Sequence, residues 1–533
     1  MAAIPSAASL RWLHYLFAIL LALTLTIAST TPSVYETDEY IRIQPELDIA
    51  TVKVINRTVL AYITPWNGKG PSIVDHFQDK IDMVSPVWYT VLVSPTSISA
   101  GDGDETTYVL SGGPPSDAEA RWLKSKQEQG LQIVPRFYLD RWQQKDYADL
   151  LSNPTNWQRL ADIITAEVEK RQYDGVVLES AASHLLFEPI QTLSSSLKPK
   201  TLTLVLPPLR TAHSLGSAKL DRVQQSQNAM IVQSIPQLAT VVDYFSIMTY
   251  DMSSAGGRVS DVSGKDFPKD SPLRGAKRGS LRQAGPNTSA KWIGENVRMI
   301  EEAVRAAARA KVEKARKQAE AEAEAGEDEE VERLKDPSNP FAYDDFSAQE
   351  VLDEAEVASK DNDVGTLPQE QDELSLIRGK LLMGLPMYTY RYPLFWVDKS
   401  TGQGVPVPPP TDPFEAKELH SRSSLLPFLR GPGEPVTTDT LLNILSNNDG
   451  VILDTKQDSE GYFDYTETVT SETIKGREGY GVKPGDQVYW RMYVPLPSTT
   501  KERLGALDEN EKVEAGVSLW ELGQANSLLL HAL

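Results

Sequence analysis

The chain has 533 residues, 40% of them hydrophobic, which is enough for one large domain or two to three ordinary ones. It contains no cysteine, which excludes disulfides, zinc–thiolate sites, iron–sulfur clusters and thiol nucleophiles. The formal net charge is −21, but residues 320–373 hold 20 acidic against 3 basic side chains, so the remaining surface is near neutral, carries no basic stripe, and disfavours nucleic acid as a partner.

The N-terminal residues have the layout of a secretory signal peptide. Arg11 and His14 precede an uncharged apolar run at 15–27, and small residues follow at 28–30. We expect residues 1–30 to be a signal and 31–58 an N-terminal segment; an uncleaved anchor is the alternative, although the run is short for a bilayer. The chain is then expected in the secretory pathway, bound for the extracellular space, cell wall or vacuole/lysosome, with no stable membrane span after cleavage.

Two glycosylation sequons agree with passage through that pathway. They begin at Asn56 and Asn287, each followed two positions later by Thr or Ser. Both asparagines are therefore candidate glycan sites.

Short apolar runs rich in β-branched residues alternate with amphipathic stretches, a pattern typical of parallel strands joined by helices. Residues 154–171 are one such helix, with Asn153 as its cap and Trp157, Leu160 and Ile164 on one stripe. Eight repeats favour an α/β fold of the (β/α)8 barrel type over 59–533. The predicted strands are 59–64, 83–90, 131–138, 175–179, 201–206, 242–248, 381–385 and 515–520.

Two insertions interrupt this pattern. The first, at 301–375, starts as a helix rich in Ala, Glu, Lys and Arg and continues as an acidic tract before strand seven. It has too few large apolar side chains to offset its ordering entropy, so most of it is expected to be disordered, and no calcium-loop spacing is present. The second, at 451–492, alternates apolar and polar residues and predicts a small β-ribbon between strands seven and eight.

Aromatic and charged side chains gather where the predicted strands end, and the carboxyl ends of barrel strands are where such folds place their sites. Aromatic faces pack on sugar rings, while carboxylates and hydroxyls bind the polar edge. Any one of these aromatics alone is more often a core residue, but the set predicts a saccharide site. The candidate binding residues are Tyr62, Trp66, Trp88, Arg136, Glu179, Tyr250, Asp251, Tyr388 and Trp520.

Several ordered motifs resemble family-18 glycoside hydrolases, the chitinase family. Met248-Thr249-Tyr250-Asp251 looks like the family's M-x-Y-D signature, and Tyr173-Asp174-Gly175 starts like its D-G-x-D-x-D-x-E motif. Within the family, the chain is most similar to the chitinase domain-containing protein 1 group, from about residue 59 to the C-terminus with the acidic insertion unmatched. That similarity rests on LAYITPWN at 60–67, VSPVW at 84–88, IVPR at 133–136 and SLWELGQ at 518–524.

The resemblance implies substrate-assisted hydrolysis, in which the last Glu of D-G-x-D-x-D-x-E is the general acid. Registered on Asp174, the motif puts Val177 and Glu179 at the two Asp positions and Ala181 at the acid position. Glu179 is two residues short of it, about 6.6 Å of strand rise, which is too far for proton transfer. A missing proton donor commonly costs about 10²–10⁴ in rate, so the resemblance predicts binding without turnover.

Three hypotheses follow for this chain. The leading one is a binder of chitin or N-acetylglucosamine oligosaccharides that lacks an assigned catalytic residue. The second is an active hydrolase using another carboxylate, with Glu179, Asp251, Glu521 or a loop residue as donor. The third is a scaffold for a protein partner. No cofactor is expected, and no metal, because the six histidines show no ligand spacing.

Overall fold

The computed structural model describes residues 34–46, 52–94, 107–217, 219–277, 279–333, 368–455, 460–475, 480–507 and 515–533. The signal peptide predicted at 1–30 and residues 334–367 of the acidic tract lie outside this set. No helix in the described ranges is long and apolar enough to cross a membrane.

Eight parallel strands close into a barrel. In chain order they are β2 (Val59–Ile63), β3 (Met83–Pro86) continued by β4 (Tyr89–Ser94), β6 (Gln132–Ile133) continued by β7 (Arg136–Leu139), β8 (Gly175–Glu179), β9 (Thr201–Leu206), β10 (Tyr244–Ile247), β13 (Leu381–Pro386) and β21 (Gly516–Trp520). Each pairs in parallel with the next, and β21 pairs with β2 to complete the ring. The predicted (β/α)8 barrel is confirmed.

Strands two and three are each interrupted, and this is the main departure from the predicted strands. Backbone hydrogen bonds bridge the breaks, from Val87 N to Ile63 O at 2.9 Å and from Val134 N to Val84 O at 2.9 Å. Pro135 has no N–H to donate, which accounts for the break in strand three. The antiparallel strand β5 (Thr107–Gly112) extends the sheet beyond β4.

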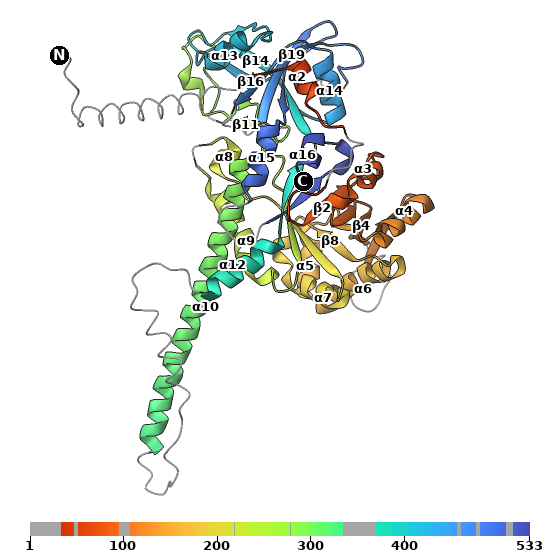
Figure 1. Ribbon diagram of the computed structural model, residues 1–533. Helices are drawn as coiled ribbons and strands as arrows, with labels where there is room; N and C mark the ends of the chain where they lie inside the picture. Colours follow the sequence, from red (N-terminus) through yellow and green to blue (C-terminus); the bar gives the residue numbers. More distant parts are fainter. Residues whose placement is uncertain are drawn as a thin grey trace, which may run out of the picture.

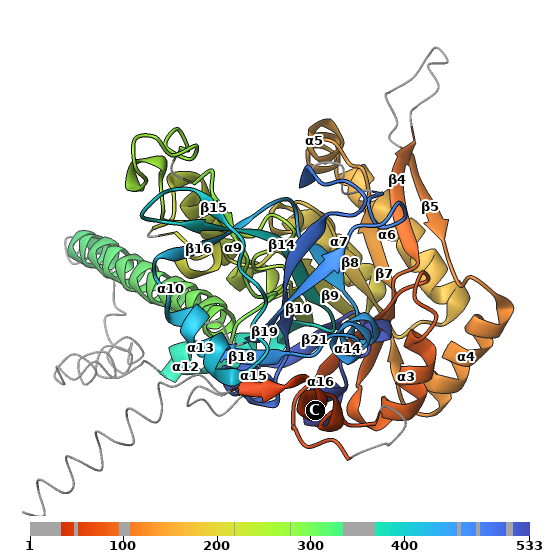
Figure 2. The same ribbon diagram turned by 90° about the horizontal axis from the view of Figure 1, so that it is seen from above.

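Helices cover the outside of the barrel (Figure 2). Helix α6 spans Pro154–Arg171, as predicted, and the Asn153 side chain caps it by accepting from Thr155 N. Apolar residues of the strands' outer faces and of these helices form the largest core cluster. The other helices around the barrel are α3 (Gly70–Phe77), α4 (Asp117–Glu128), α5 (Gln144–Ser152), α7 (Phe187–Leu197), α8 (Ala212–Leu215), α9 (Arg222–Leu238), α15 (Pro497–Gly505) and α16 (Ser527–Ala532).

A separate set of side chains fills the barrel interior. Leu60, Met83, Val177, Val205 and Leu382 form its apolar layer. Above them a polar line crosses the barrel, because Tyr62 donates to Ser246 at 2.9 Å and Ser246 donates to Ser518 at 3.1 Å. The interior is therefore packed, and a site of the barrel itself is expected at its carboxyl-terminal mouth, where barrel folds place their sites.

A second sheet, wholly antiparallel, lies above the barrel in Figure 1. Three of its strands fall in the predicted 451–492 ribbon, but the sheet also recruits the N-terminal segment and the chain directly after β13. Its strands are β1 (Val34–Glu36), β14 (Thr389–Asp398), β15 (Gly404–Val405), β16 (Leu425–Leu429), β17 (Glu434–Val436), β18 (Val451–Thr455), β19 (Glu460–Thr468) and β20 (Gln487–Val494).

Both faces of this second sheet are buried. Helices α2 (Thr37–Arg42) and α14 (Thr438–Ser446) contribute to the core on one face, with Tyr40, Leu441 and Trp490. Helix α13 (Pro413–Ser421) contributes to the other, which is rich in tyrosine and tryptophan. The sheet is thus a packed body with its own core, and all of its strands except β1 lie between barrel strands seven and eight in the sequence.

The first predicted insertion begins inside a barrel helix. Helix α10 spans Ala290–Arg333 and projects beyond the barrel, as Figure 1 shows. Its apolar stripe is buried as far as Ala308, and Glu301 pairs with Arg378 of α12 (Pro368–Lys380) at 2.5 Å. Residues 301–308 therefore pack as part of the barrel, because their stripe meets its outer core.

Candidate functional site

An aromatic floor lies at the carboxyl-terminal mouth of the barrel. The rings of Trp520 and Tyr250 stack with centroids 6.1 Å apart and an interplanar angle of 7°. Tyr62 meets Trp520 edge-on at 5.2 Å. Gly384 makes room for this packing, since a Cβ there would come within 2.8 Å of the Tyr250 ring. Strands one, six, seven and eight together thus fix the floor.

Arg136 and Glu179 stand beside this floor as an ion pair. Their Nη1 and Oε2 atoms are 2.8 Å apart, and the side chains are 14% and 20% exposed. The Arg136 guanidinium also lies 5.9 Å from the Trp520 ring centroid and 5.2 Å from that of Tyr138. The Glu179 carboxylate is therefore paired with the Arg136 guanidinium.

Asp251 ends strand six and accepts hydrogen bonds from two tyrosines. The hydroxyls of Tyr388 and Tyr390 both donate to Oδ1, the latter at 3.0 Å. Burial raises the pKa of both tyrosines, and the Asp251 charge raises it further, so both hydroxyls stay protonated donors. Asp251 itself has a φ of 55°, a left-handed conformation that Asp tolerates better than most residues.

The two remaining tryptophans of the candidate set lie apart. Trp66, in the loop after β2, is 66% exposed and free of the packed floor. Trp88 belongs to the outer core between strands and helices and is 8% exposed. Met83 and Val87 face the barrel interior, whereas Val84 and Trp88 face the outer core, as the period-two alternation of a strand requires. Trp88 is therefore removed from the candidate binding set.

The acid position is an exposed turn. Strand β8 ends at Glu179, and Ala181 follows in a turn with an exposed side chain. Glu521, the other carboxylate near the strand ends, is 1% exposed and accepts from Thr64, Asn67 and the Gly523 N–H. Burial raises the pKa of Glu521, yet these contacts commit its oxygens to supporting the loop that carries Trp66.

Asn287 requires a correction as a glycan site. It is fully buried, and its Nδ2 donates to Tyr388 O at 2.8 Å. A glycan on this nitrogen would have to displace the core around it, so Asn287 is a structural residue. Asn56 is exposed and remains a candidate.

Sequence reasoning missed two residues of the mouth. Tyr390 lies one residue into strand β14, outside any recognised motif. Arg210 follows β9 and donates to the backbone oxygens of Asp251 and Met252 at 3.3 and 3.2 Å. An isolated cation after an apolar strand was the available signal for Arg210.

Among the described residues, no group of three or more His, Cys, Asp or Glu side chains is placed to hold a metal ion. A hollow of about 290 Å³ lies between the loop after β10 and strand β16, and Leu281, Phe428 and Arg430 are among its lining residues.

No protein-family model matches the sequence. Among solved structures, the chain is similar to a chitinase from Chromobacterium violaceum, with 12% identity over 89% of this chain and 97% of that one and a TM-score of 0.46. It is also similar to a family-18 N-acetylglucosaminidase from Paenibacillus barengoltzii (11% identity, 90% and 99% coverage, TM-score 0.43). The Group IV chitinase of Ostrinia furnacalis gives 13% identity, 90% and 98% coverage and a TM-score of 0.42. These similarities do not assign an activity to this chain.

Proposed function

We propose that this chain binds chitin-like oligosaccharides of N-acetylglucosamine at the barrel mouth without cleaving them. In this proposal, the chain is a secreted, chitinase-like binding protein.

The proposal rests on the absence of a carboxylate at the acid position of strand four and on the pairing of the carboxylate before it. The position where the family motif has its acid is Ala181, in an exposed turn, and the preceding inward carboxylate is paired with Arg136. General acid catalysis needs a donor within about 2.6–3.2 Å of the leaving oxygen. Glu179 is held in an ion pair two residues away, so protonation of a leaving group has no evident donor on this strand.

The features that support binding are those that a sugar requires. Trp520, partly exposed, presents a ring whose position is fixed by Tyr62, Tyr250 and Arg136. Polar groups surround it, with Asp251 and the Arg136–Glu179 pair available for hydroxyl and acetamido groups. An aromatic face flanked by a few fixed polar groups is the usual composition of a saccharide site.

The hydrolase alternative requires a second acid, and Asp251 and Glu521 are the two carboxylates near the strand ends that could supply one. Asp251 accepts from two tyrosine hydroxyls, so it is held as an acceptor. Glu521 has the raised pKa that a proton donor needs, but it is 1% exposed and its oxygens are occupied. Neither observation favours turnover.

Calorimetric titration with chitotriose tests the proposal, with cellotriose, which lacks the acetamido groups, as the control sugar. Saturable binding of chitotriose and much weaker binding of cellotriose are expected. Equal binding of both sugars, or of neither, would contradict a chitin-like ligand.

A further inference from the structure

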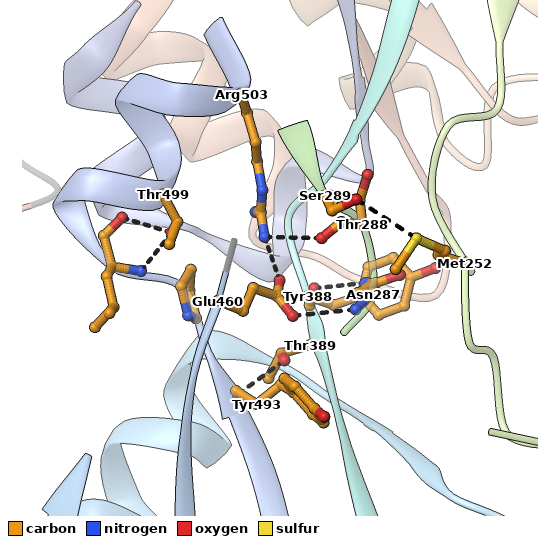
Figure 3. Close-up of polar contacts among 12 residues, drawn as sticks. Met252, Asn287, Thr288, Ser289, Tyr388, Thr389, Glu460, Tyr493, Thr499 and Arg503 are labelled. Carbon is orange, nitrogen blue, oxygen red and sulfur yellow. Dashed lines mark hydrogen bonds and ion pairs between the residues drawn. The ribbon is translucent and has the colours of Figure 1, made fainter. Parts of the chain in front are cut away.

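A buried polar cluster joins the second sheet to the barrel mouth (Figure 3). At its centre is the ion pair of Glu460, the first residue of β19, with Arg503 of α15, at 2.5 Å and with side chains 2% and 4% exposed. The second carboxylate oxygen of Glu460 accepts from Asn287 N at 3.0 Å. Arg503 also donates to Thr288 O at 3.3 Å. The Glu460 carboxylate of the second sheet and the Arg503 guanidinium of α15 therefore both bind residues 287–288.

Asn287 connects these contacts to residues of the barrel mouth. Its Oδ1 accepts from Asp251 N at 2.8 Å, and its Nδ2 donates to Tyr388 O at 2.8 Å. Its backbone oxygen accepts from Met252 N at 2.8 Å. A single asparagine thus ties the ends of strands six and seven together, next to the point where Tyr388 donates to the Asp251 carboxylate.

Local hydrogen bonds help to fix the Asp251 backbone. Its φ of 55° lies in the left-handed region, which Asp visits more readily than most non-glycine residues but less often than the right-handed region. Two of the hydrogen bonds to Asn287 fall on Asp251 and on Met252 directly after it. A buried ion pair by itself adds little net stability, which makes positional control the better explanation for Glu460.

We infer that Glu460 is a positioning residue of the mouth, acting through Asn287 to fix Asp251 and Tyr388 in their binding geometry. The inference rests on the proposed function, because it assigns a role to the inserted sheet in the same saccharide site. It also assigns the sheet a role beyond packing, because Glu460 on one of its strands helps to hold the end of strand six in place.

The substitution Glu460→Gln perturbs this relay selectively. Glu460 accepts on both oxygens, from Arg503 on one and from Asn287 N on the other. A glutamine has one oxygen and one NH₂ group, and the charged Arg503 takes the oxygen because charge-assisted hydrogen bonds are the stronger ones. The NH₂ group then faces the Asn287 N–H, donor against donor, and that contact is lost.

Asp464→Asn is the matched control. Asp464 lies on the same strand and forms a buried ion pair with Arg491 at 2.8 Å, with side chains 1% and 11% exposed. No contact of the described structure joins that pair to Asn287. Both variants disturb a buried carboxylate–guanidinium pair of the sheet, but only Glu460→Gln disturbs the mouth.

The test measures chitotriose affinity by calorimetry and amide hydrogen exchange of the peptide that contains Asp251 and Met252. Glu460→Gln is expected to accelerate exchange in that peptide and to weaken binding about five- to tenfold, which is the part of the lost hydrogen-bond free energy that the relay passes to the mouth. Asp464→Asn is expected to leave both unchanged. Asn287→Ala, which keeps the Glu460–Arg503 pair, should weaken binding at least as much and is the substitute if Glu460→Gln does not fold.

The outcomes separate the two claims. Unchanged exchange at Asp251 in Glu460→Gln overturns the relay, and faster exchange with unaltered affinity overturns its role in binding. Equal loss of affinity in Asp464→Asn shows a general effect of the sheet and also overturns the inference. Absence of saccharide binding by the wild type refutes the proposed function instead, whatever the exchange shows.

Discussion

Replacement of Trp520 by Ala removes the ring on which the proposed sugar rests. The loss is more than a contact, because Tyr62, Tyr250 and Arg136 are all arranged around that ring, at centroid distances of 5.2, 6.1 and 5.9 Å. A stacking contact on an aromatic side chain is worth about 1–3 kcal/mol, as measured for nucleobases and carried over here to a sugar ring. That range corresponds to a fall in affinity of about 5- to 150-fold.

The assay is calorimetric titration of chitotriose into each variant, after far-ultraviolet circular dichroism has established that the fold is retained. Trp88→Ala is the control, since Trp88 is a buried tryptophan of the outer core and its loss costs stability without touching the mouth. The structure predicts that Trp88→Ala lowers the melting temperature and leaves affinity unchanged. Wild-type affinity in Trp520→Ala, or equal losses in both variants, would refute the aromatic floor as the binding surface.

The remaining predictions concern carboxylates and glycans. Glu179→Gln removes the charge but keeps an oxygen that accepts from Arg136, so chitotriose affinity should change by less than about threefold. A large loss of affinity would show that the charge itself binds sugar. Mass spectrometry of protein secreted from a eukaryotic host should find a glycan on the exposed Asn56 and none on the buried Asn287; glycan at Asn287 would contradict its packing. Burial raises the pKa of Glu521, so the folded state binds more protons than the unfolded state just above the ordinary glutamate pKa, and stability falls as pH rises through that window. Glu521→Gln should lack this fall, so the difference in free energy of unfolding between the variant and the wild type should shift in favour of the variant from about pH 4 toward neutrality. Denaturant unfolding measures this difference, and parallel pH curves for the two proteins would contradict a raised pKa at Glu521.

The barrel could be predicted because its signal is local and repeated. Most strands are short apolar runs, several of them rich in β-branched residues, and helix Pro154–Arg171 has an apolar stripe and an Asn153 cap, with bounds that agree with the prediction. The break in strand three was missed although Pro135, which cannot donate to a ladder, is visible in the sequence. Trp88 was expected at the mouth from its aromatic type and its place near the end of strand two, but the alternation from Met83 to Val87 turns it to the outer core.

The second sheet was only partly predictable, because its pairings join distant segments. β1 pairs with β18, more than 400 residues apart in the chain, and β14 pairs with four other strands. No local pattern specifies such partners. The same holds for Asn287, whose sequon indicated a surface glycan while its role depends on Glu460, Asp251 and Tyr388, each brought to it only by the fold.

The central claim is binding without cleavage, and one proton NMR time course with chitotriose tests both parts. Saturation transfer from the protein to the sugar reports binding, and the reducing-end anomeric signals of the same sample count any new chain ends. Saturable transfer with a constant number of reducing ends over days, from pH 4 to 8, is the predicted result. Growth of new reducing ends would show an active hydrolase with a proton donor other than residue 181, and absence of transfer would show that the mouth does not hold this sugar.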